Sequence, residues 1–270
     1  MIAFPNAKIN LGLNVIAKRS DGYHNIETIF YPIPLNDVLE IVHSKQQDTA
    51  YTWHNSGLPI DVPADRNICI KALNIVKRSH RISPIDIQLH KTIPFGAGLG
   101  GGSADGAAMI QLLNQLFELH ISIEEQMTMA TELGADCPFF ISNKPSFATG
   151  IGNQLKPMEL SLSGYHLVLV KPPIHISTPD AYAGVTPGEP KVGLSEIIKN
   201  PVSQWRTLLK NDFEDSIFKK HPPIANIKAQ LYNSGAIYSS MSGSGSSVFG
   251  LFENPVKIEI PDCFIWQGEL

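Results

Sequence analysis

The chain has 270 residues, of which 43% are hydrophobic and 17% charged, and this composition favours a folded enzyme-like protein over a disordered chain. A formal net charge of −4 without a long basic run disfavours nucleic acid as the main partner. Three widely spaced cysteines give no zinc signature, and no signal core or stretch of 18 apolar residues occurs, so we expect a cytoplasmic protein away from membranes.

The first ninety residues are predicted to consist mainly of β-strands. They alternate apolar and polar side chains and are rich in Ile, Leu and Val, which suits a pleated, half-buried surface. Apolar residues recur at helical spacing over 67–80, which predicts a helix, and a further strand is expected at 85–93. The strands expected before that helix span 9–17, 26–33, 38–42 and, with a weaker signal, 51–53.

The rest of the chain mixes helices and strands, which favours an α+β fold of two layers. Helices are expected over 103–119 and 123–133. The polar, glycine-rich stretch 143–157 predicts a boundary between an ATP-binding domain, 1–150, and a substrate-binding domain, 151–270. The elements expected after this boundary are a strand at 166–171, several helices within 193–234, and strands at 236–239 and 248–252.

Residues 94–106 read PFGAGLGGGSADG and hold six glycines between an expected strand and an expected helix. This order of strand, glycine loop and helix start points backbone N–H groups at an anion. Glycine permits positive φ angles and leaves no Cβ between the backbone and a phosphate. We therefore interpret the segment as a cradle for a polyphosphate and expect the chain to bind a nucleotide.

Other kinds of glycine loop fit this segment less well. Gly96, Gly98 and Gly101 satisfy the dinucleotide pattern G-x-G-x-x-G, but no convincing strand follows the helix to carry an acidic residue to a ribose. The Gly-Lys-Ser/Thr of the common P-loop is absent, as are the HRD and DFG companions of the protein-kinase loop. A flexible linker is disfavoured, because the glycines adjoin a helix without a Ser/Gly repeat.

Lys8 is a candidate catalytic residue in the first long strand. Lys8 and Asn10 stand two residues apart there, so their side chains share a face. An ammonium group on an otherwise apolar strand is costly unless it has a partner, which would suit a functional lysine. On the sequence alone, an edge-strand lysine that faces water is a slightly preferred alternative.

Asp136 is the second candidate, in the segment GADCPFF. It follows Gly134, where the preceding helix is expected to stop, and it is expected at the start of a short helix, where the macrodipole favours an anion. Taken alone, the position suits an ordinary N-cap aspartate. Together with Lys8 it would suit a carboxylate that either orients a substrate hydroxyl or accepts its proton.

Two turns carry further candidates. SDGYHN, residues 20–25, would present Tyr23 for stacking on a flat ring and His24 for hydrogen bonds to its edge, or would be a hairpin turn with a packed tyrosine. MSGSGSSVFG, residues 241–250, would add backbone N–H groups near a phosphate, or would be a plain hairpin loop.

Together these segments resemble the GHMP kinases, a family of small-molecule kinases. Three family motifs occur in order: the strand NAKINLGLNV, the loop PFGAGLGGGSADGA and the turn SGSGSSVFGLF. KRSDGYHNIETIF, LGADCPFFI, ATGIGNQL and ISTPDAY resemble the members that act on a cytidyl diphosphate sugar alcohol. The resemblance covers about residues 6–252. It implies a two-domain α+β fold, with a mixed α/β nucleotide-binding domain containing a left-handed βαβ unit, and a C-terminal ferredoxin-like domain.

The resemblance also implies an activity. The chain would be an ATP-dependent kinase that phosphorylates the 2-hydroxyl of 4-diphosphocytidyl-2-C-methyl-D-erythritol, in the non-mevalonate route to isopentenyl diphosphate and dimethylallyl diphosphate. ATP and Mg²⁺ are the implied cofactors. The implied partner is the small-molecule substrate, without nucleic acid or membrane, and the chain would be a monomer or a homodimer.

Residue roles follow from the same resemblance. Lys8 and Asp136 match the positions that flank the acceptor hydroxyl and are the implied catalytic residues. The turn near Ser242 to Ser246 would support the phosphate site, and many relatives carry a glycine in the loop before ISTPDAY, where this chain reads VKPPIH. The implied substrate contacts are Asn10, Tyr23, His24, Thr178 and Tyr182, with Tyr182 stacking on the cytosine. The implied ATP contacts are Pro94, Phe95, Gly96, Ala97, Gly98, Leu99, Gly100, Gly101, Gly102 and Ser103.

Three other functions share part of this pattern. A homoserine- or mevalonate-type kinase would have the same motifs but would not need Tyr23, His24 and Tyr182 as a base clamp. A nucleotide-binding relic without turnover would have no need to retain Lys8 and Asp136. An RNA-binding module with a similar βαβ unit is disfavoured by the acidic charge balance.

Overall fold

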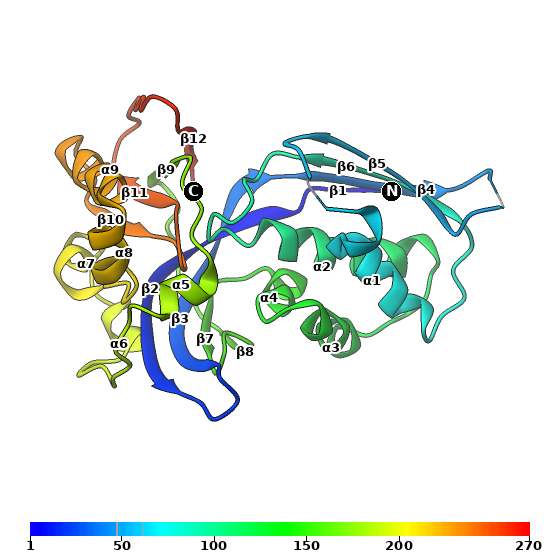
Figure 1. Cartoon of the computed structure of the whole chain (residues 1–270), viewed down its shortest axis with the longest axis horizontal. Helices are drawn as coiled ribbons and strands as arrows, with labels where there is room; N and C mark the ends of the chain where they lie inside the picture. The colour runs from blue at the N-terminus through cyan, green and yellow to red at the C-terminus, as the bar shows by residue number, and fades with distance from the viewer. Residues whose placement is uncertain (47, 61) are drawn as a thin grey trace. The chain divides into compact units, whose positions relative to one another are not determined.

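A computed structural model describes residues 1–46, 48–60 and 62–270 (Figure 1). The chain forms two compact units, each built from separate stretches of sequence. The first unit comprises Met1–Ala7, Leu35–Phe95 and Gly100–Asn143, and the second comprises Lys8–Pro34, Gly96–Leu99 and Lys144–Leu270. The expected division at residue 150 differs from this arrangement, because most of the first two long strands and part of the glycine loop belong with the C-terminal residues. The assignment of ATP and substrate binding to separate domains stays a prediction.

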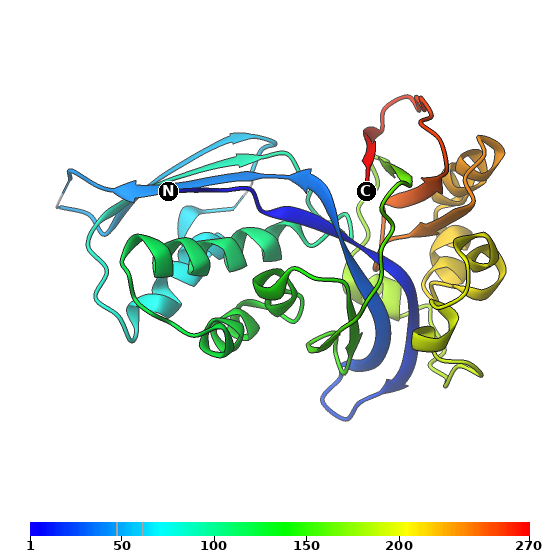
Figure 2. The same cartoon turned by 180° about the vertical axis from the view of Figure 1, so that it is seen from behind.

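The first unit packs helices on one face of a four-stranded sheet, as both views show (Figures 1 and 2). The strand order is β1 (Ile2–Ala3), β4 (Val38–His43), β6 (Ile85–Lys91) and β5 (Tyr51–Gly57). β4 pairs antiparallel with β6, whereas β5 runs parallel to β6. A parallel pair needs a crossover, and η1 (Ala64–Arg66) with α1 (Ile68–Lys77) forms it.

Two helices of the first unit, α1 and α3, begin with a side-chain cap. Asn67 caps α1, because its side chain accepts a hydrogen bond from the backbone N–H of Cys69. Ser122 and Glu125 form a capping box at the start of α3 (Ile123–Leu133), the helix predicted at these bounds. α2 (Gly101–Leu116) begins inside the glycine loop, two residues before the predicted start, and α4 (Cys137–Ser142) is short.

One sheet of the second unit contains the polar stretch that suggested a domain boundary. Its order is β2 (Asn6–Lys18), β3 (His24–Asn36), β7 (Ser146–Thr149) and β8 (Gln154–Pro157). β7 and β8 form an antiparallel hairpin in which Thr149 pairs with Gln154. Gly150 and Gly152 have positive φ angles of 67° and 100° in its turn. The glycines and polar residues therefore mark a hairpin turn and two strands that the sequence analysis missed.

The other sheet of this unit has the order β10 (Tyr238–Met241), β11 (Val248–Phe252), β9 (His166–Lys171) and β12 (Phe264–Glu269), with every neighbouring pair antiparallel. This is the order of a ferredoxin-like β-α-β-β-α-β unit. A loop over 253–263 stands where the second helix would be. The helices between β9 and β10 are α5 (Thr178–Tyr182), α6 (Leu194–Ile197), α7 (Val202–Leu208), α8 (Glu214–Lys220) and α9 (Pro222–Asn233).

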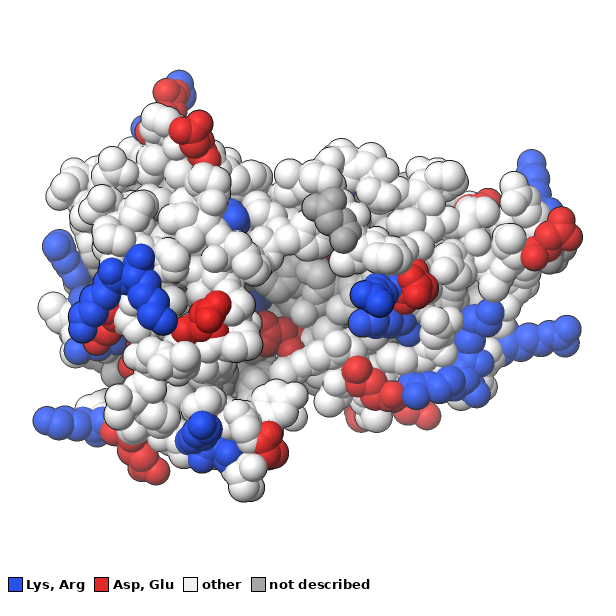
Figure 3. Space-filling view, in the orientation of Figure 1, with Lys and Arg blue, Asp and Glu red and all other residues white. Residues whose placement is uncertain are grey.

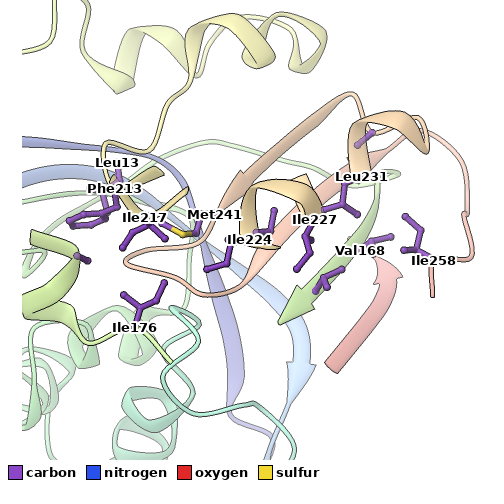
Figure 4. Packing of buried hydrophobic residues seen from close by; sticks show 14 of the residues in the cluster. Leu13, Val168, Ile176, Phe213, Ile217, Ile224, Ile227, Leu231, Met241 and Ile258 are labelled. Carbon is purple, nitrogen blue, oxygen red and sulfur yellow. The ribbon is translucent and has the colours of Figure 1, made fainter. Parts of the chain in front are cut away.

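A hydrophobic cluster joins β2, the C-terminal sheet and helices α8 and α9 (Figure 4). Leu13 and Val15 contribute from β2, and Ile217 and Ile224 contribute from the helices. This packing fixes the strand that carries Lys8 and Asn10 to the turn between β10 and β11. Within the described part of the chain, no helix has both the length and the apolar character needed to cross a bilayer.

Candidate active site

Lys8 is buried in β2 and directed at the glycine loop. Only 3% of it is exposed, so the alternative of an edge-strand lysine that faces water is wrong. Its Nζ donates hydrogen bonds to Oδ1 of Asn10 at 2.6 Å and to the carbonyl oxygen of Gly98 at 3.1 Å. The same Nζ lies 4.7 Å from the centre of the Phe30 ring, a cation–π contact. Lys8 and Asn10 therefore share one face of the strand, as their spacing predicts.

Hydrogen bonds hold the Asn10 side chain in one orientation. Its Nδ2 donates to Oγ1 of Thr28 at 2.9 Å, and Thr28 donates in turn to the carbonyl oxygen of Gly12 at 2.6 Å. Because Nδ2 is engaged in this way, Oδ1 is left to accept from Lys8. Thr28 is a positioning residue that the sequence analysis missed.

The turn between β10 and β11 closes on the same loop. Oγ of Ser242 donates to the carbonyl oxygen of Gly98 at 2.9 Å, and the backbone N–H of Lys8 donates to the carbonyl oxygen of Leu99, also at 2.9 Å. The first strand, the glycine loop and the C-terminal turn, which lie far apart in the sequence, therefore meet at Gly98.

The glycine loop has the conformation that its sequence predicts. Gly96, Gly98 and Gly100 have φ angles of 58°, 74° and 69°. Left-handed residues at alternate positions are typical of a backbone nest, in which successive N–H groups point at an anion. A Cβ on Gly98 would lie 2.0 Å from the carbonyl oxygen of Ser242, so no larger residue fits there.

Asn211 fixes the C-terminal turn through hydrogen bonds to its backbone, and the sequence analysis did not identify this residue. Its Nδ2 donates to the carbonyl oxygens of Met241 and Gly243, both at 2.8 Å. Oε1 of Glu214 accepts from the backbone N–H of Met241 at 2.8 Å. Both side chains are buried, so their contacts with the turn are shielded from water. The segment NDFE, which leads into α8, was the available signal, but nothing in it shows which backbone groups its side chains contact.

Two of the residues expected to bind the cytosine, His24 and Tyr182, lie against each other. The ring of His24 stacks on Tyr182 with 4.6 Å between centroids and 16° between planes, and Phe213 packs edge-on against Tyr182 at 4.9 Å. Tyr23 is 61% exposed in the preceding turn. Thr178 is the first residue of α5. The structure brings His24 and Tyr182 together, and the contacts expected of Tyr23, His24, Thr178 and Tyr182 with a substrate stay predictions.

Asp136 occupies the N-cap position of α4, as predicted, but its side chain makes no capping hydrogen bond. It belongs to the first unit and Lys8 to the second, so their joint action stays a prediction. The neighbouring Cys137 is buried, and burial raises the pKa of its thiol to about 11, against the effect of a hydrogen bond with Ser103. Cys137 is therefore an inert thiol, as a buried structural cysteine should be.

A buried ion cluster lies under the start of α2 and was not predicted. Nζ of Lys91 contacts a carboxylate oxygen of Asp37 and donates to Oδ2 of Asp105 at 2.7 Å. Asp37 also accepts from the backbone N–H groups of Thr92 and Ile93, at 2.6 and 2.8 Å. Burial raises the pKa of Asp105 to about 8. The ammonium group of Lys91 acts against this rise, and the neighbouring carboxylate of Asp37 adds to it. This cluster joins the residue before β4 to the end of β6 and the first turns of α2.

We find no site in which protein side chains alone would hold Mg²⁺ within the described ranges 1–46, 48–60 and 62–270. They contain no group of three or more His, Cys, Asp or Glu side chains that could hold a metal ion. Mg²⁺ in phosphate-transfer sites is commonly held by substrate phosphates and water with one or two carboxylates.

Comparison with known proteins agrees with this geometry. The model for the N-terminal domain of GHMP kinases matches residues 67–144, and the model for the C-terminal domain matches 194–260. A 4-diphosphocytidyl-2-C-methyl-D-erythritol kinase of Parabacteroides distasonis is 57% identical over 274 residues, with 100% of both chains covered. The enzyme of the same name from Bacteroides fragilis is 53% identical over 273 residues, again with 100% of both chains covered.

Solved structures give the same result. A crystal structure of 4-(cytidine 5'-diphospho)-2C-methyl-D-erythritol kinase has a TM-score of 0.80 at 31% identity, covering 94% of this chain and 91% of that one. A mevalonate kinase has a TM-score of 0.72 at 15% identity, covering 99% and 98%, and this likeness shows the fold alone. The chain belongs to the GHMP kinase family.

Proposed function

We propose that this chain transfers the γ-phosphoryl group of ATP to the 2-hydroxyl of 4-diphosphocytidyl-2-C-methyl-D-erythritol, giving the 2-phosphate. Relatives that carry the name of this kinase match over the whole chain at 57% and 53% identity, and members of the GHMP family use ATP as the phosphate donor. The observation that carries the proposal is the hydrogen bond from the buried Lys8 ammonium group to the carbonyl oxygen of Gly98, which supports a role for Lys8 beside a loop proposed to bind phosphate.

In the proposed reaction, the hydroxyl oxygen of the acceptor attacks the γ-phosphorus, the bond to the ADP oxygen breaks, and the hydroxyl proton leaves. Backbone N–H groups of the glycine loop and the start of α2 stabilise negative charge on the phosphates. The Lys8 ammonium holds the acceptor oxygen and the transferring group together. Asp136 orients the hydroxyl or accepts its proton. MgATP is the second substrate, and the metal neutralises part of the phosphate charge. Such transfers depend mainly on positioning and electrostatics.

Substrate selection is proposed to rest on the aromatic residues of the second unit. The stacked pair of His24 and Tyr182 offers a flat surface beside a hydrogen-bonding ring edge. Tyr23 would close on the cytosine from the exposed turn, and Thr178 would contact the substrate nearby. Asn10 would contact the substrate from the strand that carries Lys8. Mevalonate and homoserine carry no base and would gain nothing from this arrangement.

We further propose that the chain acts in the cytoplasm on small-molecule partners and is a monomer or a homodimer. On the face shown in Figure 3, Lys and Arg side chains are interspersed with Asp and Glu side chains. Such a mixed surface supports small-molecule chemistry more than binding to a nucleic-acid backbone, which favours clustered basic residues.

The test is ATP consumption against a panel of acceptors: the cytidyl-methylerythritol substrate, mevalonate, phosphomevalonate, homoserine and galactose. Turnover is expected with the cytidyl compound, and analysis of the product should place the phosphate at the 2-position. Turnover only with another member of the panel would overturn the substrate assignment. Binding of ATP without single-turnover transfer of the γ-phosphoryl group to any acceptor would overturn the kinase assignment.

A further inference from the structure

The loop between β9 and α5 brings an imidazole against the glycine loop. A Cβ built on Gly96 would lie 2.7 Å from Nδ1 of His175 and 2.9 Å from Cε1. Gly96 has a φ angle of 58°, so it is the first of the left-handed glycines in the loop. The edge of the His175 ring therefore packs against the backbone of Gly96, where the left-handed conformation of the loop begins. His175 belongs to the segment VKPPIH, which directly precedes ISTPDAY.

The residues on both sides of His175 are fixed. The carbonyl oxygen of Ile174 accepts a hydrogen bond of 2.6 Å from Oγ of Ser246, a fully buried residue of the C-terminal turn. Ile176 is buried in the hydrophobic cluster (Figure 4). His175 itself is exposed. Its backbone is thus held on both sides, while its ring faces solvent at the loop.

We infer that His175 donates a ring N–H to an oxygen of the β- or γ-phosphate of ATP bound on the glycine loop. An imidazole always carries at least one N–H, and phosphate oxygens are strong acceptors. The contact would add a side-chain donor to the backbone amides of the glycine loop. The inference rests on the proposed function, because it needs the triphosphate at this loop. His175 is a binding residue in this account and takes no part in proton transfer to the acceptor.

Calorimetry with ATP and AMP in the presence of Mg²⁺ tests the inference without any acceptor. His175→Ala and His175→Phe both remove the donor, and His175→Phe keeps a flat ring against Gly96. We expect each to weaken ATP binding about 10-fold or more, the effect of losing a hydrogen bond to a charged group, while AMP binding changes less than about twofold. The KM for ATP should rise in parallel, and the KM for the acceptor should stay unchanged.

Two conservative variants identify the nitrogen that donates. His175→Asn places an amide near the position of Nδ1, and His175→Gln places one near Nε2. We expect one of them to recover most of the preference for ATP over AMP. Wild-type affinity for ATP in His175→Phe, equal losses for ATP and AMP, or no recovery in either amide variant would overturn the inference.

The same data separate this inference from the proposed function. A wild-type protein that binds ATP no more tightly than AMP would mean that the loop is not a triphosphate site, so the proposed function would fail first. If His175→Phe keeps the wild-type preference for ATP over AMP, the proposed function is still supported, and only the role of His175 in binding ATP is rejected.

Discussion

Replacing Gly98 by alanine is expected to abolish most activity without preventing folding. The added Cβ would lie 2.0 Å from the carbonyl oxygen of Ser242 and 2.9 Å from its carbonyl carbon. Both partners are backbone, so no side-chain rotation relieves the collision. The φ angle of 74° adds about 1–2 kcal/mol of strain for an L-residue, and overpacking typically adds about 1–3 kcal/mol. The loop or the turn must move, and Lys8 and Ser242 then lose their common acceptor, the carbonyl oxygen of Gly98.

A matched control separates strain from collision. Gly235 has a φ angle of 99°, and a Cβ there would meet nothing within 4 Å. Gly235→Ala should therefore show the strain alone, and Gly98→Ala should be less stable than this control by about 1–3 kcal/mol in urea unfolding. A displacement of about 1 Å in the loop should lower kcat/KM by up to about 10²-fold, in Gly98→Ala only. Equal stability of the two variants, with kcat/KM of Gly98→Ala within twofold of wild type, would refute this account of the loop.

Three further variants test the site and the ion cluster. Lys8→Met should lower kcat by about 10²- to 10³-fold while circular dichroism stays native, and a retained kcat would remove Lys8 from the mechanism. Tyr23→Ala should raise the KM for the cytidyl substrate by roughly 5- to 100-fold through lost base stacking, and an equal rise in the KM for ATP would contradict a role in the base clamp. Burial raises the pKa of Asp105 from 3.8 to about 8, so the folded protein binds this proton more tightly than the unfolded chain does, and the contribution of Asp105 to stability should fall as the pH rises from about 4 to 8. Asp105→Asn should flatten that fall in urea unfolding across this range, whereas a wild-type slope in the variant would mean that Asp105 is not the group that titrates.

Elements with a strong local pattern were predicted well from the sequence. α3 has its predicted bounds because a capping box marks its start and a glycine follows its end. The alternation of β2 also predicted that Lys8 and Asn10 share a face, which their hydrogen bond confirms. In both cases the information lies within a few residues of the element itself, so periodicity and caps were sufficient.

Long-range pairing explains what the sequence analysis missed. β7 and β8 are only four residues long each, and their polar residues resemble a linker until β3 is known to pair with β7. Lys91 meets Asp37 across 54 positions of sequence, and Asn211 contacts the turn 30 residues ahead of it. Neither contact can be recognised from the amino acids that surround its two residues in the sequence. The sequence could identify charged and amide side chains as unusual at such positions, but only the fold shows which partner satisfies each one.

The order of the family motifs acquires a physical meaning at Gly98. Its carbonyl oxygen accepts from Lys8 of the first motif and from Ser242 of the third, while its own missing Cβ allows the backbone of the third motif to approach. The first and third motifs therefore meet at one acceptor atom of the second motif, and a change in any of the three motifs alters the hydrogen bonds at that atom. Ser242→Ala would leave Lys8 as the remaining side-chain donor to this carbonyl oxygen in the described network, and Gly98→Ala would displace both donors. Coupling of this kind predicts that the two substitutions are not additive, because either one already disturbs the same atom.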